Sequence, residues 1–153
     1  MRASSQATWP CKRGRLVIIW RQRDRTIRRR LREGREFAGA DLHQARLVAM
    51  NLRAKSFRDA NLEYADLTGA DLETADLRDA RLKGAYLTGA SLIGADLRGA
   101  GLRDAYMPAT NLDRARLEDT DLSGIVYDQA TTWPAGYQPP RPDVGLWHGR
   151  RDQ

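Results

Sequence analysis

The sequence has one cysteine, Cys11, and two histidines, His43 and His148, which lie far apart along the chain. One cysteine cannot form an internal disulfide, so we expect a reducing compartment such as the cytoplasm. No metal-ligand spacing, nucleophile motif or glycine-rich phosphate loop accompanies these residues, and Cys11 has no catalytic partner nearby in the sequence. These absences predict a protein that is not an enzyme and binds no metal or cofactor.

Long apolar runs are also missing. The longest run near the N-terminus, Leu16–Trp20, has five residues, which is far too short for a membrane span and short for a signal-peptide core. The 153 residues fit a single domain, and no stretch resembles a linker between two cores. The sequence therefore predicts a soluble, cytoplasmic, single-domain protein without a membrane span.

What the chain does contain is a five-residue repeat without insertions from residue 35 to residue 129, which makes 19 units. Leucine occupies the central position in 15 units, and the residue two places earlier is small in most of them. The other four central residues are Phe37, Phe57, Met107 and Tyr127. The small residue is replaced at Arg35, Met50, Lys55 and Ile125. A disordered, low-complexity tract would not require a bulky apolar residue at all 19 centres.

A period of five fits neither a helix nor one long strand. Five steps of about 100° would spread the leucines all round a helix, and an odd period would alternate them between the two faces of a strand. Within one unit, however, the small residue and the leucine are two positions apart and point the same way in an extended stretch. If the chain bends by about 90° after each unit, four units close one coil of a solenoid with all leucines inside.

The segments "ANLEYADLTGADLETADLRDARLKGAYLTGA" (60–90), "LREGREFAGADL" (31–42) and "VYDQATTWPAGY" (126–137) resemble the pentapeptide-repeat family. The resemblance implies an all-β fold, a right-handed quadrilateral β-helix, with a short N-terminal helix as a cap. We divide the chain into a basic N-terminal arm with the capping helix (1–34), a solenoid of nearly five coils (35–129), and a C-terminal cap and tail (130–153).

Residues 20 positions apart should then stack in adjacent coils, as Phe37 should on Phe57. The predicted core residues are Phe37, Phe57, Leu62, Leu82, Leu102, Met107 and Tyr127. The last coil needs a cover over its open edge, and Trp133 and Tyr137 are the candidates for this C-terminal cap.

Charge is divided unevenly along the chain. Residues 1–34 carry eleven Lys and Arg against two Asp and Glu, whereas the repeats carry 12 against 16. The arm is therefore +9 and the repeats −4. The arm either caps the first coil or binds nucleic acid, an anionic membrane surface or an acidic partner. Its candidate binding residues are Arg21, Arg23, Arg25, Arg28, Arg29 and Arg30.

One face of the predicted rod combines aromatic and apolar side chains with little charge. Its candidate interaction residues are Tyr86, Tyr106, Val126, Val48 and Pro108. Aromatic residues are enriched and charges are depleted in interface cores, so a protein partner or a second copy in a homodimer should prefer this face. The two tyrosines could equally well serve only to stack on each other.

Three functions remain open. The first is a non-enzymatic module that binds an unidentified protein partner through a rigid surface. The second follows from the resemblance: quinolone-resistance members of the family present an acidic, DNA-like rod to DNA gyrase. A charge of −4 is weak beside that of a duplex, however, and arginines interrupt it. The third is binding of nucleic acid or an anionic surface through the arm.

Overall fold

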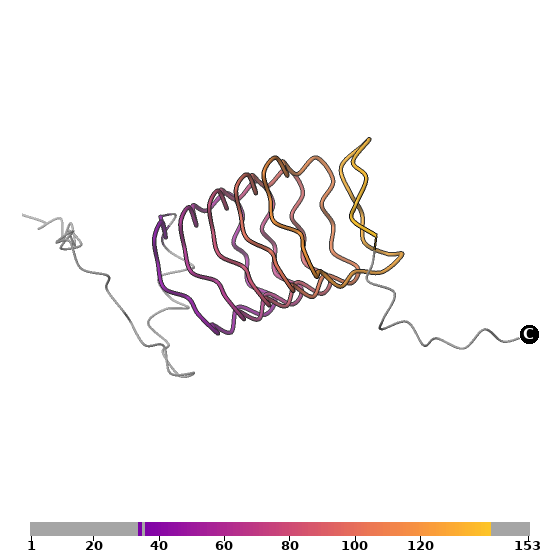
Figure 1. Cartoon of the computed structure of the whole chain (residues 1–153). Helices are drawn as coiled ribbons and strands as arrows, with labels where there is room; N and C mark the ends of the chain where they lie inside the picture. Colours follow the sequence, from indigo (N-terminus) through magenta and orange to yellow (C-terminus); the bar gives the residue numbers. More distant parts are fainter. Residues whose placement is uncertain (1–33, 35, 142–153) are drawn as a thin grey trace, which may run out of the picture.

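The five-residue units coil into a four-sided rod. The structure, a computed structural model, describes Gly34 and residues 36–141. Coils of similar outline lie side by side along the rod axis, from the indigo end near residue 36 to the yellow end beyond residue 130 (Figure 1). The predicted N-terminal helix and the arm arginines lie outside the described residues. The structure therefore describes the solenoid and the segment that follows it.

The backbone of each unit consists of the inner, mostly small residue, an extended bridge residue, a central residue and a two-residue turn. The described residues contain no helix, and each extended stretch is a single bridge residue rather than a longer strand. Sixteen parallel bridges link residues of adjacent coils within the described part of the chain. Fifteen of them join residues 20 positions apart, from Glu36↔Ser56 to Tyr106↔Val126. Four units of five residues therefore make one coil.

Three backbone hydrogen bonds per unit join each coil to the next, and one of them runs from the N–H of Gly84 to the carbonyl of Arg103 at 2.9 Å. The N–H of Leu82 donates to the carbonyl of Gly101 at 2.7 Å, and the N–H of Gly101 donates to the carbonyl of Ala80 at 2.9 Å. A fourth bond closes the turn, because the N–H of Ala85 donates to the carbonyl of Leu82 at 3.0 Å. The buried backbone groups thus pair between coils, as in a parallel sheet.

The turns share one conformation. Every fifth residue from Gly39 to Gly124 has a positive φ between 52° and 69°, and eleven of these 18 residues are not glycine. A positive φ at the third residue of a turn is what a type II turn requires. The corners therefore follow from the solenoid path even where the local residue disfavours a left-handed conformation.

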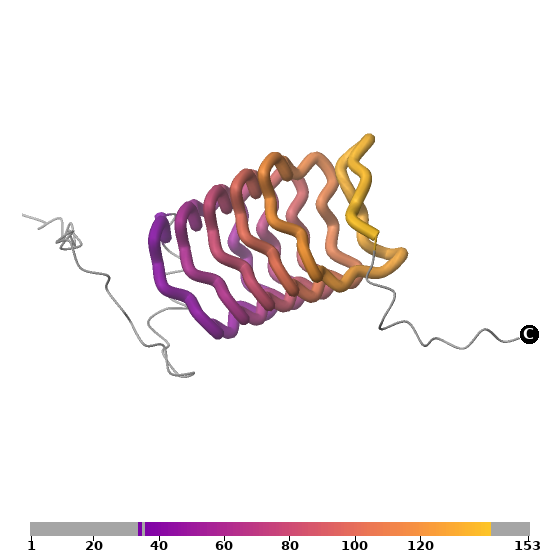
Figure 2. The backbone as a smooth tube through the Cα atoms, viewed as in Figure 1, coloured from indigo at the N-terminus to yellow at the C-terminus, as the bar shows by residue number. Residues whose placement is uncertain are grey.

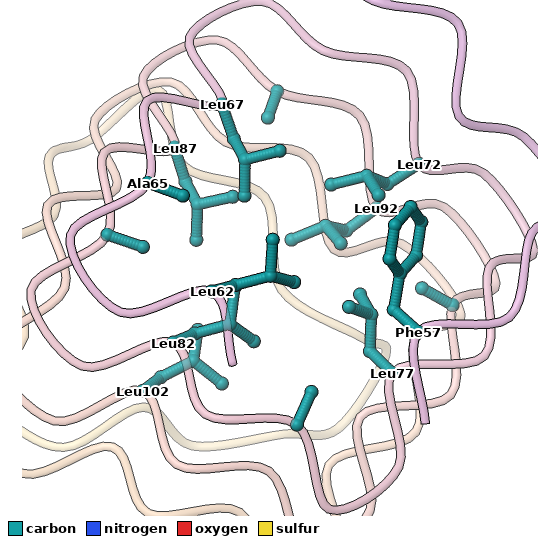
Figure 3. Close-up of a cluster of buried hydrophobic side chains, with 14 of the residues drawn as sticks. Phe57, Leu62, Ala65, Leu67, Leu72, Leu77, Leu82, Leu87, Leu92 and Leu102 are labelled. Atoms are coloured by element: carbon teal, nitrogen blue, oxygen red, sulfur yellow. The ribbon is translucent and has the colours of Figure 1, made fainter. Parts of the chain in front are cut away.

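The central residues and the small residues before them fill the rod (Figure 3). Leu62, Leu82 and Leu102 are each 1% exposed, and Met107 is fully buried. The rings of Phe37 and Phe57 lie 5.5 Å apart and nearly parallel, with Phe57 fully buried and Phe37 half-buried at the first coil. Phe57 stands in one column with Leu77 because their units are 20 residues apart.

Lys55 occupies one of the inner positions that alanine fills elsewhere. It is 8% exposed, its Nζ donates to the carbonyl of Gly34 at 2.6 Å, and the same atom lies 6.0 Å from the ring centroid of Phe37. A buried ammonium needs such partners to offset the loss of water. The departure from a small residue is thus accommodated at the end of the rod, where the core is least enclosed.

The coil pattern continues past the predicted end at Gln129. Thr132 forms a bridge with Asn111, which lies 21 positions earlier rather than 20. One extra residue therefore enlarges the last corner, and Thr131 and Trp133 take the inner and central positions of a further unit. Asp128 supports this corner by accepting hydrogen bonds from the N–H groups of Ala109 at 2.9 Å and Ala130 at 3.0 Å. The ladder thus ends at Thr132, three residues beyond the predicted boundary.

Three aromatic side chains cover part of the C-terminal end of the core. The ring of Tyr127 meets that of Trp133 edge to face with centroids 5.2 Å apart, and Trp133 stacks on Tyr137 at 5.5 Å. All three are half-buried and pack against the core, and the hydroxyl of Tyr127 donates to the carbonyl of Pro140 at 2.7 Å. Figure 2 shows this final yellow segment standing against the last coil. Trp133 and Tyr137 pack against the core at this end, and their role as the cap stays a prediction.

Candidate interaction face

The bridge residues on each side of the rod form a ladder that points outward. We name two opposite sides by their ladders. The tyrosine face has Arg46, Asp66, Tyr86, Tyr106 and Val126. The charged face has Glu36, Ser56, Asp76, Asp96 and Arg116. These two sides are opposite, because along each coil the unit of one is separated from the unit of the other by the unit of a third side.

The tyrosine face brings the two predicted tyrosines together. Tyr86 and Tyr106 are linked by a parallel bridge, and their ring centroids are 6.5 Å apart at an angle of 60°. The exposed fractions are 51% for Tyr86 and 43% for Tyr106, so the contact between the rings leaves much of both side chains in solvent. The tyrosines touch each other and still present a large aromatic surface.

The other predicted residues surround this pair. Val126 continues the ladder and is half-buried, while Val48 and Pro108 occupy the following turn position on the first and fourth coils and are also half-buried. The backbone beneath them is held by the bonds from Tyr86 N–H to Ala65 and from Tyr106 N–H to Ala85, each 2.9 Å. These five side chains therefore lie on one regular surface.

Charge on the tyrosine face is sparse. Its charged side chains are Arg46 and Asp66 at one end and Asp128 at the other. Among the described residues, none of the three forms an ion pair within 4.0 Å, which contrasts with the arginines of the charged face. Asp66 accepts a hydrogen bond from the N–H of Thr68 at 3.2 Å, and the N–H of Ala109 holds the pKa of Asp128 below its usual value.

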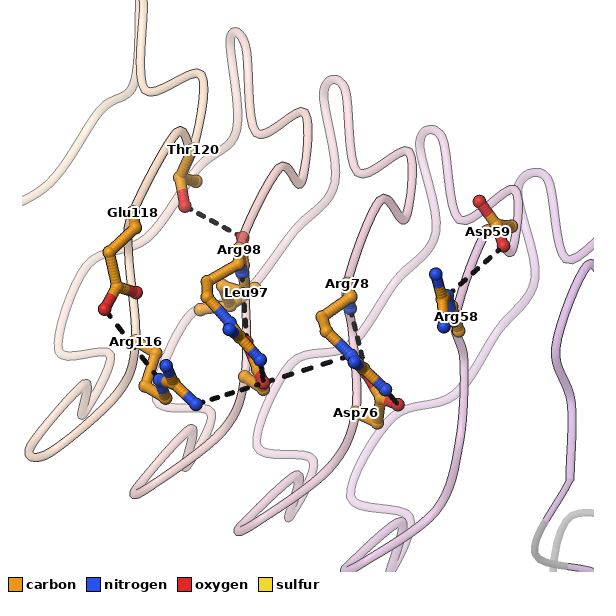
Figure 4. A network of polar contacts seen from close by, with 10 residues as sticks. Arg58, Asp59, Asp76, Arg78, Leu97, Arg98, Arg116, Glu118 and Thr120 are labelled. Carbon is orange, nitrogen blue, oxygen red and sulfur yellow. Dashed lines mark hydrogen bonds and ion pairs between the residues drawn. The ribbon is translucent and has the colours of Figure 1, made fainter.

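The charged face carries a chain of ion pairs that spans three coils (Figure 4). Arg78 binds Asp76 through two hydrogen bonds of 2.8 and 2.7 Å, and Arg98 binds Asp96 in the same way at 2.8 and 2.6 Å. Asp96 also lies 3.9 Å from Nε of Arg78 and 3.8 Å from Nη1 of Arg116. The charges of this face therefore largely satisfy one another.

These contacts change the acidity of the two carboxylates. Hydrogen bonds from Arg78 hold the pKa of Asp76 below its ordinary value, and those from Arg98 do the same for Asp96. In both cases the donated hydrogen bonds outweigh the partial burial, which on its own would raise the pKa. Both groups are therefore carboxylates at neutral pH. The charged face thus carries positive and negative groups side by side rather than a uniformly negative charge.

Tyr64 is an exposed aromatic residue that the sequence analysis did not single out. It is 43% exposed, lies at a turn position with φ of 56°, and meets His43 edge to face at 5.8 Å between centroids. It belongs to the side between the charged and tyrosine faces. Its place at the fifth position of its unit, where glycine is common, was the available signal.

Among residues 34 and 36–141, no group of three or more His, Cys, Asp or Glu side chains is placed to hold a metal ion. The described residues also include no helix long and apolar enough to cross a membrane.

Comparisons with known proteins agree with this architecture. The family model for pentapeptide repeats matches eight copies over residues 36–73, 56–92 and 85–124. Together these matches cover more than half of the chain. The regular four-sided solenoid defines a repeat protein, and this chain belongs to the pentapeptide-repeat family. Proteins of this family fold as a right-handed quadrilateral β-helix, and the bridges between residues 20 apart give this chain the same four-sided coils.

Solved structures of several family members are similar. A pentapeptide repeat protein from Nostoc Pcc 7120 is 31% identical, with 73% of this chain and 84% of that chain covered and a TM-score of 0.33. The protein Rfr23 from the cyanobacterium Cyanothece 51142 is 26% identical, with coverage of 69% and 95% and a TM-score of 0.30. QnrB1, a plasmid-mediated fluoroquinolone resistance protein, is 24% identical, with coverage of 61% and 60% and a TM-score of 0.29. No curated protein matches the chain.

Proposed function

We propose that the protein is a non-enzymatic interaction module and that the tyrosine face is its docking surface. The observation that carries the proposal is the pair of tyrosines, about half exposed, at the centre of a side with few charges. Tyrosine offers a large contact area with few rotatable bonds and a hydroxyl that can bond a partner, which is why it is common in interfaces.

The scaffold beneath the face supports this function. The four ladder residues from Asp66 to Val126 each donate a backbone hydrogen bond to the preceding coil, and the side chains beneath, such as Leu87 and Met107, are buried. A partner that binds such a surface orders little additional backbone, so the entropic cost of association is small. A rigid rod with one low-charge side is suited to specific docking.

The test is capture of partners from an extract of the native cell with the full chain as bait. The variant Tyr86→Ser/Tyr106→Ser removes the aromatic surface, and Lys83→Ser/Arg103→Ser is a matched control with two exposed residues on the adjacent side. We expect the tyrosine variant to lose specific partners that the wild type and the control retain. Equal capture by all three proteins would refute the assignment of the face.

DNA mimicry toward gyrase has less support as a second function. Arg78, Arg98 and Arg116 neutralise carboxylates along the charged face, so that side lacks the continuous negative field of a duplex. A supercoiling assay decides between the two functions. Inhibition of gyrase at micromolar protein would overturn this ranking, whereas uninhibited supercoiling would support it.

The arm remains a separate prediction because residues 1–33 lie outside the described residues. Its binding residues are still Arg21, Arg23, Arg25, Arg28, Arg29 and Arg30. If they bind nucleic acid, deletion of residues 1–25 should abolish a salt-sensitive affinity for DNA. Undiminished binding by the shortened protein would exclude the arm.

A further inference from the structure

We propose that the occupant of the tyrosine face is a second copy of this chain, packed antiparallel about a twofold axis that runs along the stretch containing Tyr86. This inference rests on the proposed function, since it names the partner of the same face. It follows from the order of side chains along the ladder and from the positions of the three charges that flank the tyrosines.

The ladder has five rungs, and Tyr86 is the third. An antiparallel twofold axis through this rung sets the first rung of one copy against the fifth rung of the other. Arg46 then meets Val126 and the adjacent Asp128 of the second copy, and the two Tyr86 side chains meet each other at the axis. The only basic side chain of the face thus lies near an acidic one.

The second and fourth rungs are also complementary in this arrangement. Asp66 of one copy lies against Tyr106 of the other, whose hydroxyl can donate a hydrogen bond to the carboxylate. Hydrogen bonds to a charged group are among the stronger polar contacts. Because the axis repeats each contact, both ends of the interface gain an Arg46–Asp128 pair and both flanks gain a Tyr106–Asp66 pair.

A parallel arrangement of the two rods is disfavoured by the same side chains. It would place Arg46 against Arg46 and Asp66 against Asp66, and like charges that face each other across an interface oppose association. The opposite, charged face is a poorer candidate for self-association. The arginines of the charged face already bind carboxylates of their own chain, so a second copy would have to compete for them.

Size limits the strength of this dimer. With about 4.8 Å between coils, the five rungs extend over roughly 19 Å. A surface of this length and of one side's width buries less than the about 800 Å² per partner of a standard stable interface. The dimer should therefore be weak and dependent on protein concentration, and sedimentation velocity over a concentration series should show a reversible monomer–dimer equilibrium.

Disulfide trapping tests the register. In a Cys11→Ser background, the variant Tyr86→Cys should cross-link to itself, because the axis brings the two positions together. The variants Arg46→Cys and Val126→Cys should cross-link with each other when mixed and far less when either is alone. A disulfide requires Cβ atoms about 4 Å apart, so the pattern discriminates between arrangements. Lys83→Cys on the adjacent side serves as the control.

The outcomes separate the two proposals. Cross-linking of Arg46→Cys with itself would overturn the antiparallel register, and trapping no greater than that of Lys83→Cys would overturn the second copy as occupant. Suppose that the wild type stays monomeric, and that the variant Tyr86→Ser/Tyr106→Ser captures fewer partners from extracts than the wild type does. The tyrosine face then binds a different protein. The proposed function would then stand without this inference. If the face neither self-associates nor captures a partner, both fail.

Discussion

The charged face and the tyrosine face have the same backbone and opposite surface chemistry. On the charged face, Arg78 and Arg98 each bind a carboxylate through two hydrogen bonds and Asp96 is near three arginines, so charges are paired within the chain. On the tyrosine face, Arg46 and Asp66 form no ion pair among the described residues, and the tyrosines are half exposed. The solenoid fixes the inner positions and leaves the outer ladder free to vary.

If the tyrosine face is the docking surface proposed above, stability and recognition belong to different sides of the rod. A side whose polar groups are satisfied by neighbouring coils contributes to holding the rod together and has little to gain from a partner. A side with exposed aromatic area and unpaired charges contributes little to folding and much to association. Substitutions on the two faces should therefore separate these properties, while substitutions in the shared interior should affect both.

The largest effect is expected in the interior beneath the charged face. Phe57→Ala removes a fully buried ring that stacks on Phe37, and should lower the free energy of unfolding by about 3 to 5 kcal/mol. Denaturant unfolding measures this, with Leu67→Ala as the matched change beneath the tyrosine face. A loss below about 1 kcal/mol would contradict the packing of Phe57 in the core.

A smaller effect is expected from the ion-pair chain. Asp96→Asn keeps an oxygen for the N–H of Arg98 but removes the charge that faces three arginines, and should cost about 1 kcal/mol at low salt and less at high salt. Asp66→Asn is the control, because Asp66 has the same ladder position on the tyrosine face. Equal losses of unfolding free energy in the two variants would contradict a stabilising role for the ion pairs of the charged face.

The same carboxylates predict the dependence of stability on pH. The folded pKa values of Asp76 and Asp96 are lowered, so their contribution is complete above the unfolded pKa of about 4 and disappears as pH falls through the lowered values. Stability should therefore decline in acid by up to about 1 kcal/mol more in the wild type than in Asp76→Asn/Asp96→Asn. If the free energy of unfolding of the two proteins fell equally with pH, these ion pairs would not be the cause of the acid sensitivity.

The smallest effect on folding is expected at the tyrosines. Tyr86→Ala loses one exposed ring contact with Tyr106 and should change the free energy of unfolding by only about 0.5 kcal/mol. Thermal unfolding at a concentration low enough to keep the protein monomeric is the measurement. A loss as large as that of Phe57→Ala would mean that the face is part of the stabilising core.

The sequence predicted the solenoid well because the central position is large and apolar in every unit. The large apolar residue at each centre implied the phase of every unit from Phe37 to Tyr127, and the bridges between residues 20 apart confirm it. The enlarged corner before Thr132 was not predicted, because the pairs that identify it join Asp128 to the distant Ala109 and Thr132 to Asn111. These contacts join residues that are far apart in the sequence, so the five-residue spacing alone does not predict them.

The surface was less predictable than the core. The spacing of 20 placed Tyr86 beside Tyr106, but the tilt of their rings and their exposure depend on the neighbouring turns. The ion pairs of Asp96 with two arginines of other coils depend on side-chain rotamers that no repeat specifies. Tyr64 was overlooked because its turn position carries no fixed residue type, so the pattern gave it no weight.

The constant offset of 20 residues also makes the number of coils a variable that can be edited. Removal of one whole coil, for example residues 66–85, would keep every remaining unit in phase and shorten the rod by one step. A ladder with an even number of rungs has no central residue, so a twofold axis would fall between two rungs instead of on Tyr86. The parity of the coil count thus decides which side chains can meet their own copies.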